Sequence, residues 1–139
     1  MSGADPRAIE SVARAGREAM RQVWRRRDER ETLSVAEAAL LELLEQHKEF
    51  RAFWEGAEPT QDDNPFIHIT LHQMIDKQLK DDEPAGTRAT LDRLVASGLD
   101  GHEARHKLMS LWAVELFGSL RAGKPLDLVG YREKLDALS

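Results

Sequence analysis

Apolar residues recur at helical spacing along nearly the whole chain, and no segment alternates apolar and polar residues for long enough to indicate a strand. The pattern therefore predicts an all-α fold, a single compact helical bundle of about five to six helices. The first expected helix is long and begins at Pro6, and the second begins at Ser34 and either continues or breaks near Lys48. The others are expected over residues 65–82, 85–97, 100–122 and 127–138.

Capping residues mark several of the expected helix ends. Ser34 and Glu37 have the spacing of a capping box, as do Asp100 and Glu103. Gly98 is a natural residue to follow the end of a helix, because glycine adopts the left-handed conformation without strain. These signals place the helix boundaries independently of the apolar pattern.

The length of the chain suits one domain. A sequence of 139 residues with 41% hydrophobic residues can bury one core, but it leaves no room for a second independent domain. We therefore expect a single helical domain over residues 1–139, in which a basic N-terminal helix (residues 1–32) packs on a core formed by residues 33–139.

Composition narrows the expected partners and location. A net charge of -5 argues against binding to nucleic acid or to an anionic membrane, because both need clustered cationic side chains. The chain has no cysteine, so any metal must be held by nitrogen and oxygen ligands. The N-terminus lacks an apolar signal-like segment, and no apolar run reaches the roughly 18 residues of a membrane span. A cytoplasmic location with small-molecule or protein partners is expected.

Arginines and tryptophans offer surfaces for a protein partner. Acidic residues dilute a basic stripe on the first helix, which is typical of a solvated or partner-binding face. The tryptophans belong to the core or to a protein interface. A protein partner or a second copy of the chain is therefore expected to bind through the first helix or through exposed tryptophans. The stripe comprises Arg7, Arg14, Arg17, Arg21 and Arg25, joined by Arg26, Arg27 and Arg30, and the tryptophans are Trp24, Trp54 and Trp112.

Four of the five histidines form two pairs at a spacing of four residues, His68 with His72 and His102 with His106. This spacing places both imidazoles of a pair on one helix face, about 5–6 Å apart at Cβ. Each pair occupies the first two turns of its expected helix, and one helix lies between them in the sequence. If the three helices run up, down and up, both pairs reach the same end of two parallel helices.

Four imidazoles in one apolar pocket require partners, because burying each without one costs roughly 1–3 kcal/mol. One divalent cation would satisfy all four, so the sequence predicts a metal site with His68, His72, His102 and His106 as ligands. Zinc, iron and manganese are the expected ions, although affinity order does not choose among them. The alternative is a non-enzymatic interaction module without metal, in which each histidine is a hydrogen-bonded core residue.

Further ligands are expected near such a cation, because neutral imidazoles leave its charge uncompensated. Asp76 continues the series of His68 and His72 at steps of four, so it is a candidate ligand or an acceptor that orients His72. His47 and Glu37 are additional candidates from the second helix, of which His47 is better placed. Each has a simpler interpretation as well: a solvated carboxylate for Asp76, a core residue for His47 and a cap for Glu37.

The segment His102-Glu103-Ala104-Arg105-His106 has the spacing in which two histidines hold zinc and a glutamate activates water. A metal-dependent hydrolase with Glu103 as the catalytic base is therefore a second hypothesis. Against it, Glu103 is explained by the Asp100 capping box, and no strand pattern is present to hold an extended peptide. Metal binding without an assigned reaction ranks first.

The sequence also resembles a bacterial protein family, the family of domain of unknown function 1841. The resemblance is carried mainly by residues 64–72, Asn-Pro-Phe-Ile-His-Ile-Thr-Leu-His, and by the segment from His102 to His106. Further matching positions are residues 33–37, residues 47–50, Ile75, Gln78, Asp82, Pro84 and Tyr131, whereas Lys48 and Arg51 stand where the family often has proline and histidine. The resemblance implies a compact helical domain with characteristic paired histidines, and it implies no activity.

Overall fold

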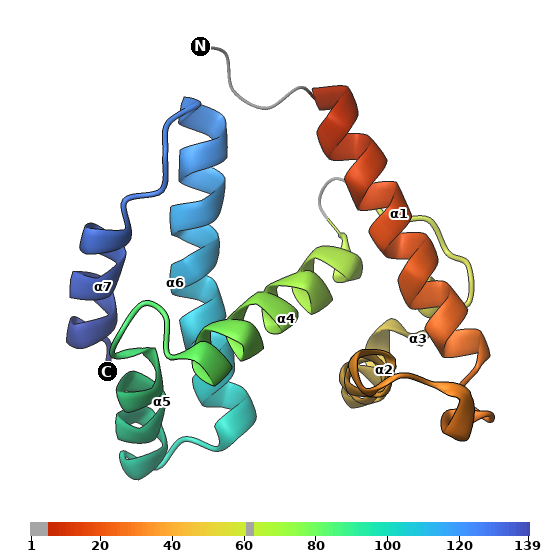
Figure 1. Ribbon diagram of the computed structural model, residues 1–139, viewed down its shortest axis with the longest axis horizontal. Helices are drawn as coiled ribbons and strands as arrows, with labels where there is room; N and C mark the ends of the chain where they lie inside the picture. Colours follow the sequence, from red (N-terminus) through yellow and green to blue (C-terminus); the bar gives the residue numbers. More distant parts are fainter. Residues whose placement is uncertain (1–5, 61–62) are drawn as a thin grey trace. The chain divides into compact units, whose positions relative to one another are not determined.

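The computed structural model describes residues 6–60 and 63–139. This part of the chain forms seven α-helices and two short 3-10 helices and no strand, which confirms the all-α prediction (Figure 1). The α-helices are α1 (Pro6–Arg25), α2 (Val35–Gln46), α3 (Arg51–Trp54), α4 (Pro65–Asp81), α5 (Thr87–Ala96), α6 (Gly101–Ala122) and α7 (Leu128–Ala137). The 3-10 helices are η1 (Arg30–Thr32) and η2 (Lys48–Phe50).

The helix count exceeds the predicted five to six because the chain breaks after α2. His47 is the C-cap of α2, with φ -118° and ψ 55°, and this non-helical conformation ends the helix. The chain then forms η2 and the four-residue helix α3 before the loop that leads to α4. The boundaries expected for α4 to α7 agree with the structure to within two residues, whereas the N-terminal helix ends at Arg25 and not at residue 32. Gly98 adopts the left-handed conformation after α5 with φ 115°.

The chain divides into two compact units, one ending at Thr70 and the other beginning at Leu71. The boundary falls within α4, whose first residues belong to one unit and whose later residues belong to the other. The expectation of a single domain over residues 1–139 stays a prediction, and residues 1–5 of its N-terminal segment lie outside the described part.

The unit that ends at Thr70 is built around α1, α2 and α3. α1 contacts both α2 and α3. Apolar side chains from these helices and from the start of α4 pack into one core, which excludes water from a continuous apolar surface. The buried members are Met20, Val23, Trp24, Leu40, Leu41, Leu44, Trp54, Phe66 and Ile69.

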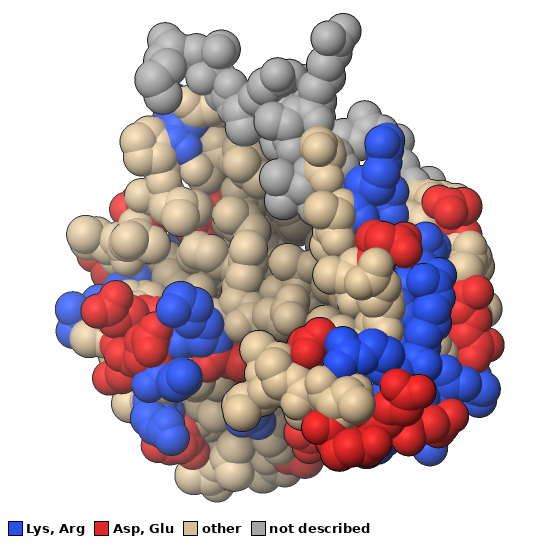
Figure 2. All heavy atoms as spheres, turned by 45° about the vertical axis from the view of Figure 1, so that its right-hand side comes forward, with Lys and Arg blue, Asp and Glu red and all other residues tan. Residues whose placement is uncertain are grey.

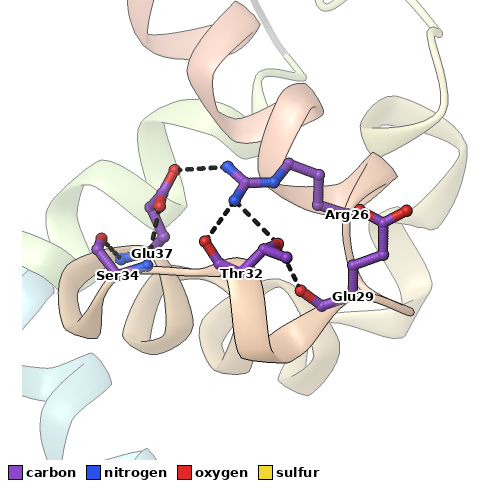
Figure 3. Close-up of polar contacts among 5 residues, drawn as sticks. All are labelled: Arg26, Glu29, Thr32, Ser34 and Glu37. Atoms are coloured by element: carbon purple, nitrogen blue, oxygen red, sulfur yellow. Dashed lines mark hydrogen bonds and ion pairs between the residues drawn. The ribbon is translucent and has the colours of Figure 1, made fainter.

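The connection between α1 and α2 is held by Arg26 (Figure 3). Its guanidinium donates to the Thr32 carbonyl oxygen at 2.6 Å and forms an ion pair with Glu37 at 3.2 Å. Glu37 also completes the predicted capping box, because its carboxylate accepts from the Ser34 N–H while Ser34 Oγ accepts from the Glu37 N–H. These bonds fix where α2 begins relative to the end of α1.

The basic stripe of α1 is only in part a solvated face. Arg21 is buried, and its guanidinium donates to the carbonyl oxygens of Phe53 and Ala57. Arg25 is exposed and pairs with Glu18. On the right of Figure 2, lysine and arginine side chains form a band bordered by acidic ones. The stripe therefore combines a structural arginine with exposed charges, and the side chain of Arg7 lies outside the described residues.

The unit that begins at Leu71 is built around α6. Both α5 and α7 pack against α6, and α7 runs back alongside it (Figure 1). Arg93 of α5 donates to the carbonyl oxygens of Leu135 and Leu138, which caps the end of α7. The buried apolar core comprises Leu71, Ile75, Leu79, Leu108, Met109, Trp112, Tyr131 and Leu135.

The three tryptophans are core residues, which is one of the two positions expected for them, and the binding of a protein partner stays a prediction. Their exposed fractions are 6% for Trp24, 1% for Trp54 and 8% for Trp112. The indole N–H of Trp54 donates to the Leu44 carbonyl oxygen at 3.2 Å, and that of Trp112 contacts Met74 Sδ at 3.3 Å. Each ring thus fills a core, and these two satisfy their polar edges within their own units.

Candidate metal centre

Three histidines of the unit that begins at Leu71 meet at one point between two helices. His72 comes from α4, and His102 and His106 come from the first two turns of α6. One ring nitrogen from each lies within 4.8 Å of the others. The spacing of four residues brings His102 and His106 together on one face, with ring centroids 4.2 Å apart. Tertiary packing then adds His72.

The shortest contact in this group joins His72 and His106. Their Nε2 atoms are 3.0 Å apart, and the two rings have centroids separated by 4.9 Å. His102 stacks on His72 at 5.1 Å with an interplanar angle of 27°. His72 is fully buried, whereas His102 and His106 are partly exposed. His72 therefore lies on the core side of the group, and His102 and His106 lie on its solvent side.

The distance between the two Nε2 atoms allows two arrangements. In one, a ring carries a hydrogen on Nε2 and donates it to the lone pair of the other. In the other, both Nε2 lone pairs bind a cation. Two ligands of a tetrahedral zinc ion with Zn–N of about 2.0–2.1 Å lie about 3.3 Å apart, a few tenths of an ångström from the 3.0 Å observed. The His72 and His106 nitrogens are thus close to the spacing of two ligands of one ion, and one nitrogen of His102 lies within 4.8 Å of them.

The course of α4 differs from the expected one. The part of α4 from Leu71 to Asp81 crosses α6 obliquely rather than running parallel to it (Figure 1). The crossing brings His72 to the first turns of α6, and the expectation of parallel helices is wrong.

Asp76 lies one turn beyond His72 on α4 and pairs with a cation of α6. Arg105 Nε donates to Asp76 Oδ1 at 3.3 Å, and both side chains are partly exposed. Arg105 is also next to His106 in the sequence, and its guanidinium donates to the Gly101 carbonyl oxygen. The predicted carboxylate is thus close to the histidine group in the same unit, and Arg105 holds it.

Glu103 lies at the start of α6, on the exposed side of the helix. Its backbone N–H donates to Asp100 Oδ1 at 2.8 Å, which is one half of the predicted capping box. The backbone of Glu103 therefore takes part in the cap of α6. The role of its carboxylate as a catalytic base stays a prediction.

The two remaining histidines form a pair in the unit that ends at Thr70. His68 Nε2 is 3.1 Å from His47 Nε2, and the Phe50 ring lies beside both. His47 Nδ1 lies 2.7 Å from the Leu43 carbonyl oxygen, so this nitrogen must carry a hydrogen and donate it. The other nitrogen of His47 then presents its lone pair to His68, as it does in metal-binding histidines.

Glu37 is engaged elsewhere in that unit. It lies in the first turn of α2, whereas His47 follows the last, so a rise of about 1.5 Å per residue separates them by roughly 15 Å. The hydrogen bond from the Ser34 N–H is the largest cause of a lowered pKa of Glu37, and Arg26 lowers that pKa further. The carboxylate is thus used by the helix cap and by Arg26.

Comparison with known proteins bears on the family. The family model described as "Domain of unknown function (DUF1841)" matches residues 13–137. The chain belongs to this family. The resemblance found in the sequence is thereby confirmed, and the matched region of this DUF1841 protein contains all five histidines. No curated protein and no solved structure matched the chain.

One residue of this DUF1841 chain was underestimated from sequence. His47 has no histidine four residues away, so helical spacing gave it no partner, and packing against α4 supplies His68.

Within the described residues, no helix combines the length and the apolar character needed to cross a membrane.

Proposed function

We propose that this DUF1841 protein binds one divalent transition-metal ion through His72, His102 and His106. The observation that carries the proposal is the convergence of one ring nitrogen from each residue within 4.8 Å. The alternative of isolated core histidines does not explain why three imidazoles from two helices share one point. Burying imidazoles against one another is costly unless a hydrogen or a cation lies between their lone pairs.

The donor set narrows the choice of ion. Imidazole nitrogen suits zinc, iron, copper and nickel, whereas manganese and magnesium prefer oxygen ligands. Of the ions expected from the sequence, zinc and iron fit three imidazoles better than manganese does. Zinc is the first ion to test because three histidines leave one position of its tetrahedron for a fourth ligand.

Asp76 is the candidate for that fourth position within the same unit. It follows His72 by one turn of α4 and would contribute a negative charge that partly balances the cation. His68 is the fourth histidine of the site predicted from the sequence, and its role as a ligand stays a prediction. The proposal of the three-histidine centre depends on neither residue.

The test is the zinc affinity of metal-free protein, measured by competition with a chromophoric chelator. His72→Ala, His102→Ala and His106→Ala should each weaken binding by more than about 100-fold, beyond the loss typical of an outer-shell change. Met109→Ala is the matched control, because it opens a cavity in the same core without removing a nitrogen ligand. It should lower the melting temperature and leave the zinc affinity within about threefold.

The same titration of His68→Ala and Asp76→Ala assigns the fourth ligand. A loss comparable to that of His72→Ala would extend the ligand set to the residue concerned. Wild-type protein that binds no zinc, or three histidine variants that bind it as well as the wild type does, would overturn the proposal.

A further inference from the structure

A second candidate site lies in the unit that ends at Thr70 and shares no residue with the proposed metal centre. A cavity of about 400 Å³ opens beside Trp24, at the end of α1. Its lining contains four cationic side chains, Arg27, Arg30, Lys48 and Arg51. They come from the turn after α1, from η1, from η2 and from α3, so the fold gathers them from separate elements.

Trp24 fixes two of these cations in place. The Arg27 guanidinium lies 4.8 Å from the Trp24 ring and that of Arg51 lies 5.8 Å from it, both within the range of a cation–π contact. Arg27 also donates to the Trp24 carbonyl oxygen at 2.9 Å, and Arg51 donates to Glu55 at 2.9 Å. Because these side chains are already held, a ligand would lose little of its binding energy to ordering them.

The cavity has an excess of positive charge. Its acidic lining residues are Asp28 and Glu45, and Glu45 pairs with Arg30 at 2.5 Å. Glu55 pairs with Arg51 at 2.9 Å, and that bond and the charge of Arg27 both lower the pKa of this carboxyl. Within the described part of the chain, Lys48 forms no ion pair, so the four cationic and two acidic lining residues leave an excess of positive charge on a protein whose net charge is -5. A protein with a negative net charge does not attract anions over its whole surface. The positive charge is therefore confined to the lining of this cavity.

We propose that this cavity binds a small, multiply charged oxyanion, such as a phosphate-bearing metabolite. Guanidinium groups present paired N–H donors that match the oxygens of phosphate and carboxylate, and lysine adds a point charge. The volume lies within the range of small-molecule sites, and the flanking carboxylates disfavour an extended polyanion such as nucleic acid. The proposal is independent of the metal centre.

The experiment is calorimetric titration of the full chain with inorganic pyrophosphate at constant ionic strength. Wild-type protein should bind one pyrophosphate, and Arg27→Gln and Lys48→Gln should each weaken binding by about tenfold or more, the effect of one lost hydrogen bond to a charged group. Glu45→Gln should strengthen binding, because it removes a repelling carboxylate and releases Arg30. Arg25→Gln is the matched control, since it removes one exposed charge from α1 outside the cavity.

The outcomes separate a built site from general attraction. Equal weakening by Arg25→Gln and Lys48→Gln, or no binding by the wild type, would overturn the proposal. Lys48 is exposed, so its variant should keep the wild-type melting temperature even if Arg27→Gln loses stability. A parallel titration with citrate identifies the ligand class: binding of pyrophosphate alone assigns phosphate, and equal binding assigns any multiply charged oxyanion.

Discussion

The Nε2 atoms of His72 and His106 lie 3.0 Å apart, although the two residues are 34 positions apart in the sequence. No local helical geometry produces this contact, because it joins α4 to α6. It exists only because the core around Ile75, Leu108 and Met109 brings the two helices together. The three histidines therefore lie together only when the unit is folded. Metal binding should for this reason stabilise the folded unit.

Arg105→Gln should strengthen zinc binding by a few fold. Arg105 is next to His106 and pairs with Asp76, so its removal takes a like charge away from the cation and releases a carboxylate one turn from His72. The expected change is small because both side chains are partly exposed and their charges are screened. Chelator competition measures it, with Lys107→Gln as a control whose amine contacts the Ser139 carbonyl oxygen instead. Weaker binding by Arg105→Gln would show that the arginine is needed to position the site.

Glu103→Gln should leave zinc affinity within about twofold of the wild type. The Glu103 side chain is exposed, and its backbone N–H rather than its carboxylate takes part in the helix cap. Asp100→Ala, which removes the cap itself, should lower the free energy of unfolding by about 1 kcal/mol. Zinc titration and urea unfolding of both variants separate the roles. If Glu103→Gln loses the metal, its carboxylate is a ligand and our assignment of the site is incomplete.

The Glu37 carboxylate should stabilise the unit in a pH-dependent way. Its pKa is lowered in the folded state, chiefly by the hydrogen bond from the Ser34 N–H. A group with a lowered pKa contributes stability above its ordinary pKa and loses it as pH falls through the folded value. Urea midpoints of the wild type should therefore exceed those of Glu37→Gln at neutral pH and converge with them in acid. Glu42→Gln, an exposed carboxylate variant on the same helix, should show no such convergence. A difference that persists in acid would contradict the assignment.

Tyr131 should resist ionisation as long as the protein is folded. Burial raises the pKa of this residue well above its ordinary value, while its hydroxyl donates to Gln78 Oε1 at 2.9 Å. It is the only tyrosine of the chain, so its absorbance can be followed without overlap from another. The tyrosinate band should be absent at pH 10 to 11 in folded protein and present in denaturant, where the pKa returns to about 10. Folding stability should fall as pH rises past that unfolded value. Tyrosinate at its ordinary pH with the fold intact would contradict the burial of this side chain.

Much of the fold follows from local patterns. Helical periodicity predicts the all-α class, and the Ser34 and Asp100 caps predict where α2 and α6 begin. The break after α2 was left open by the sequence, because the conformation of His47 depends on its bonds to Leu43 and His68. The angle at which α4 crosses α6 was also beyond reach, since it depends on side-chain packing rather than on the helices alone.

The histidine groups show the same limit. The spacing of His102 and His106 predicts their contact, because one helix contains both. The contact with His72 depends on packing between two helices. The sequence anticipated it from the matching positions of the two pairs in their helices and from the need of buried imidazoles for partners. The sequence offered His47 only as an additional ligand of the site that contains His68, because the two residues belong to different helical segments and no periodic pattern links them.

The central claim is that His72, His102 and His106 form a metal centre, and the metal content of the purified protein tests it most directly. Protein prepared without a histidine tag and exhaustively dialysed should contain close to one zinc or iron ion per chain by elemental analysis. His106→Ala prepared in parallel should contain almost none, whereas Met109→Ala should keep its metal. Wild-type protein that carries no metal and takes up neither zinc nor iron when each is added would contradict the account.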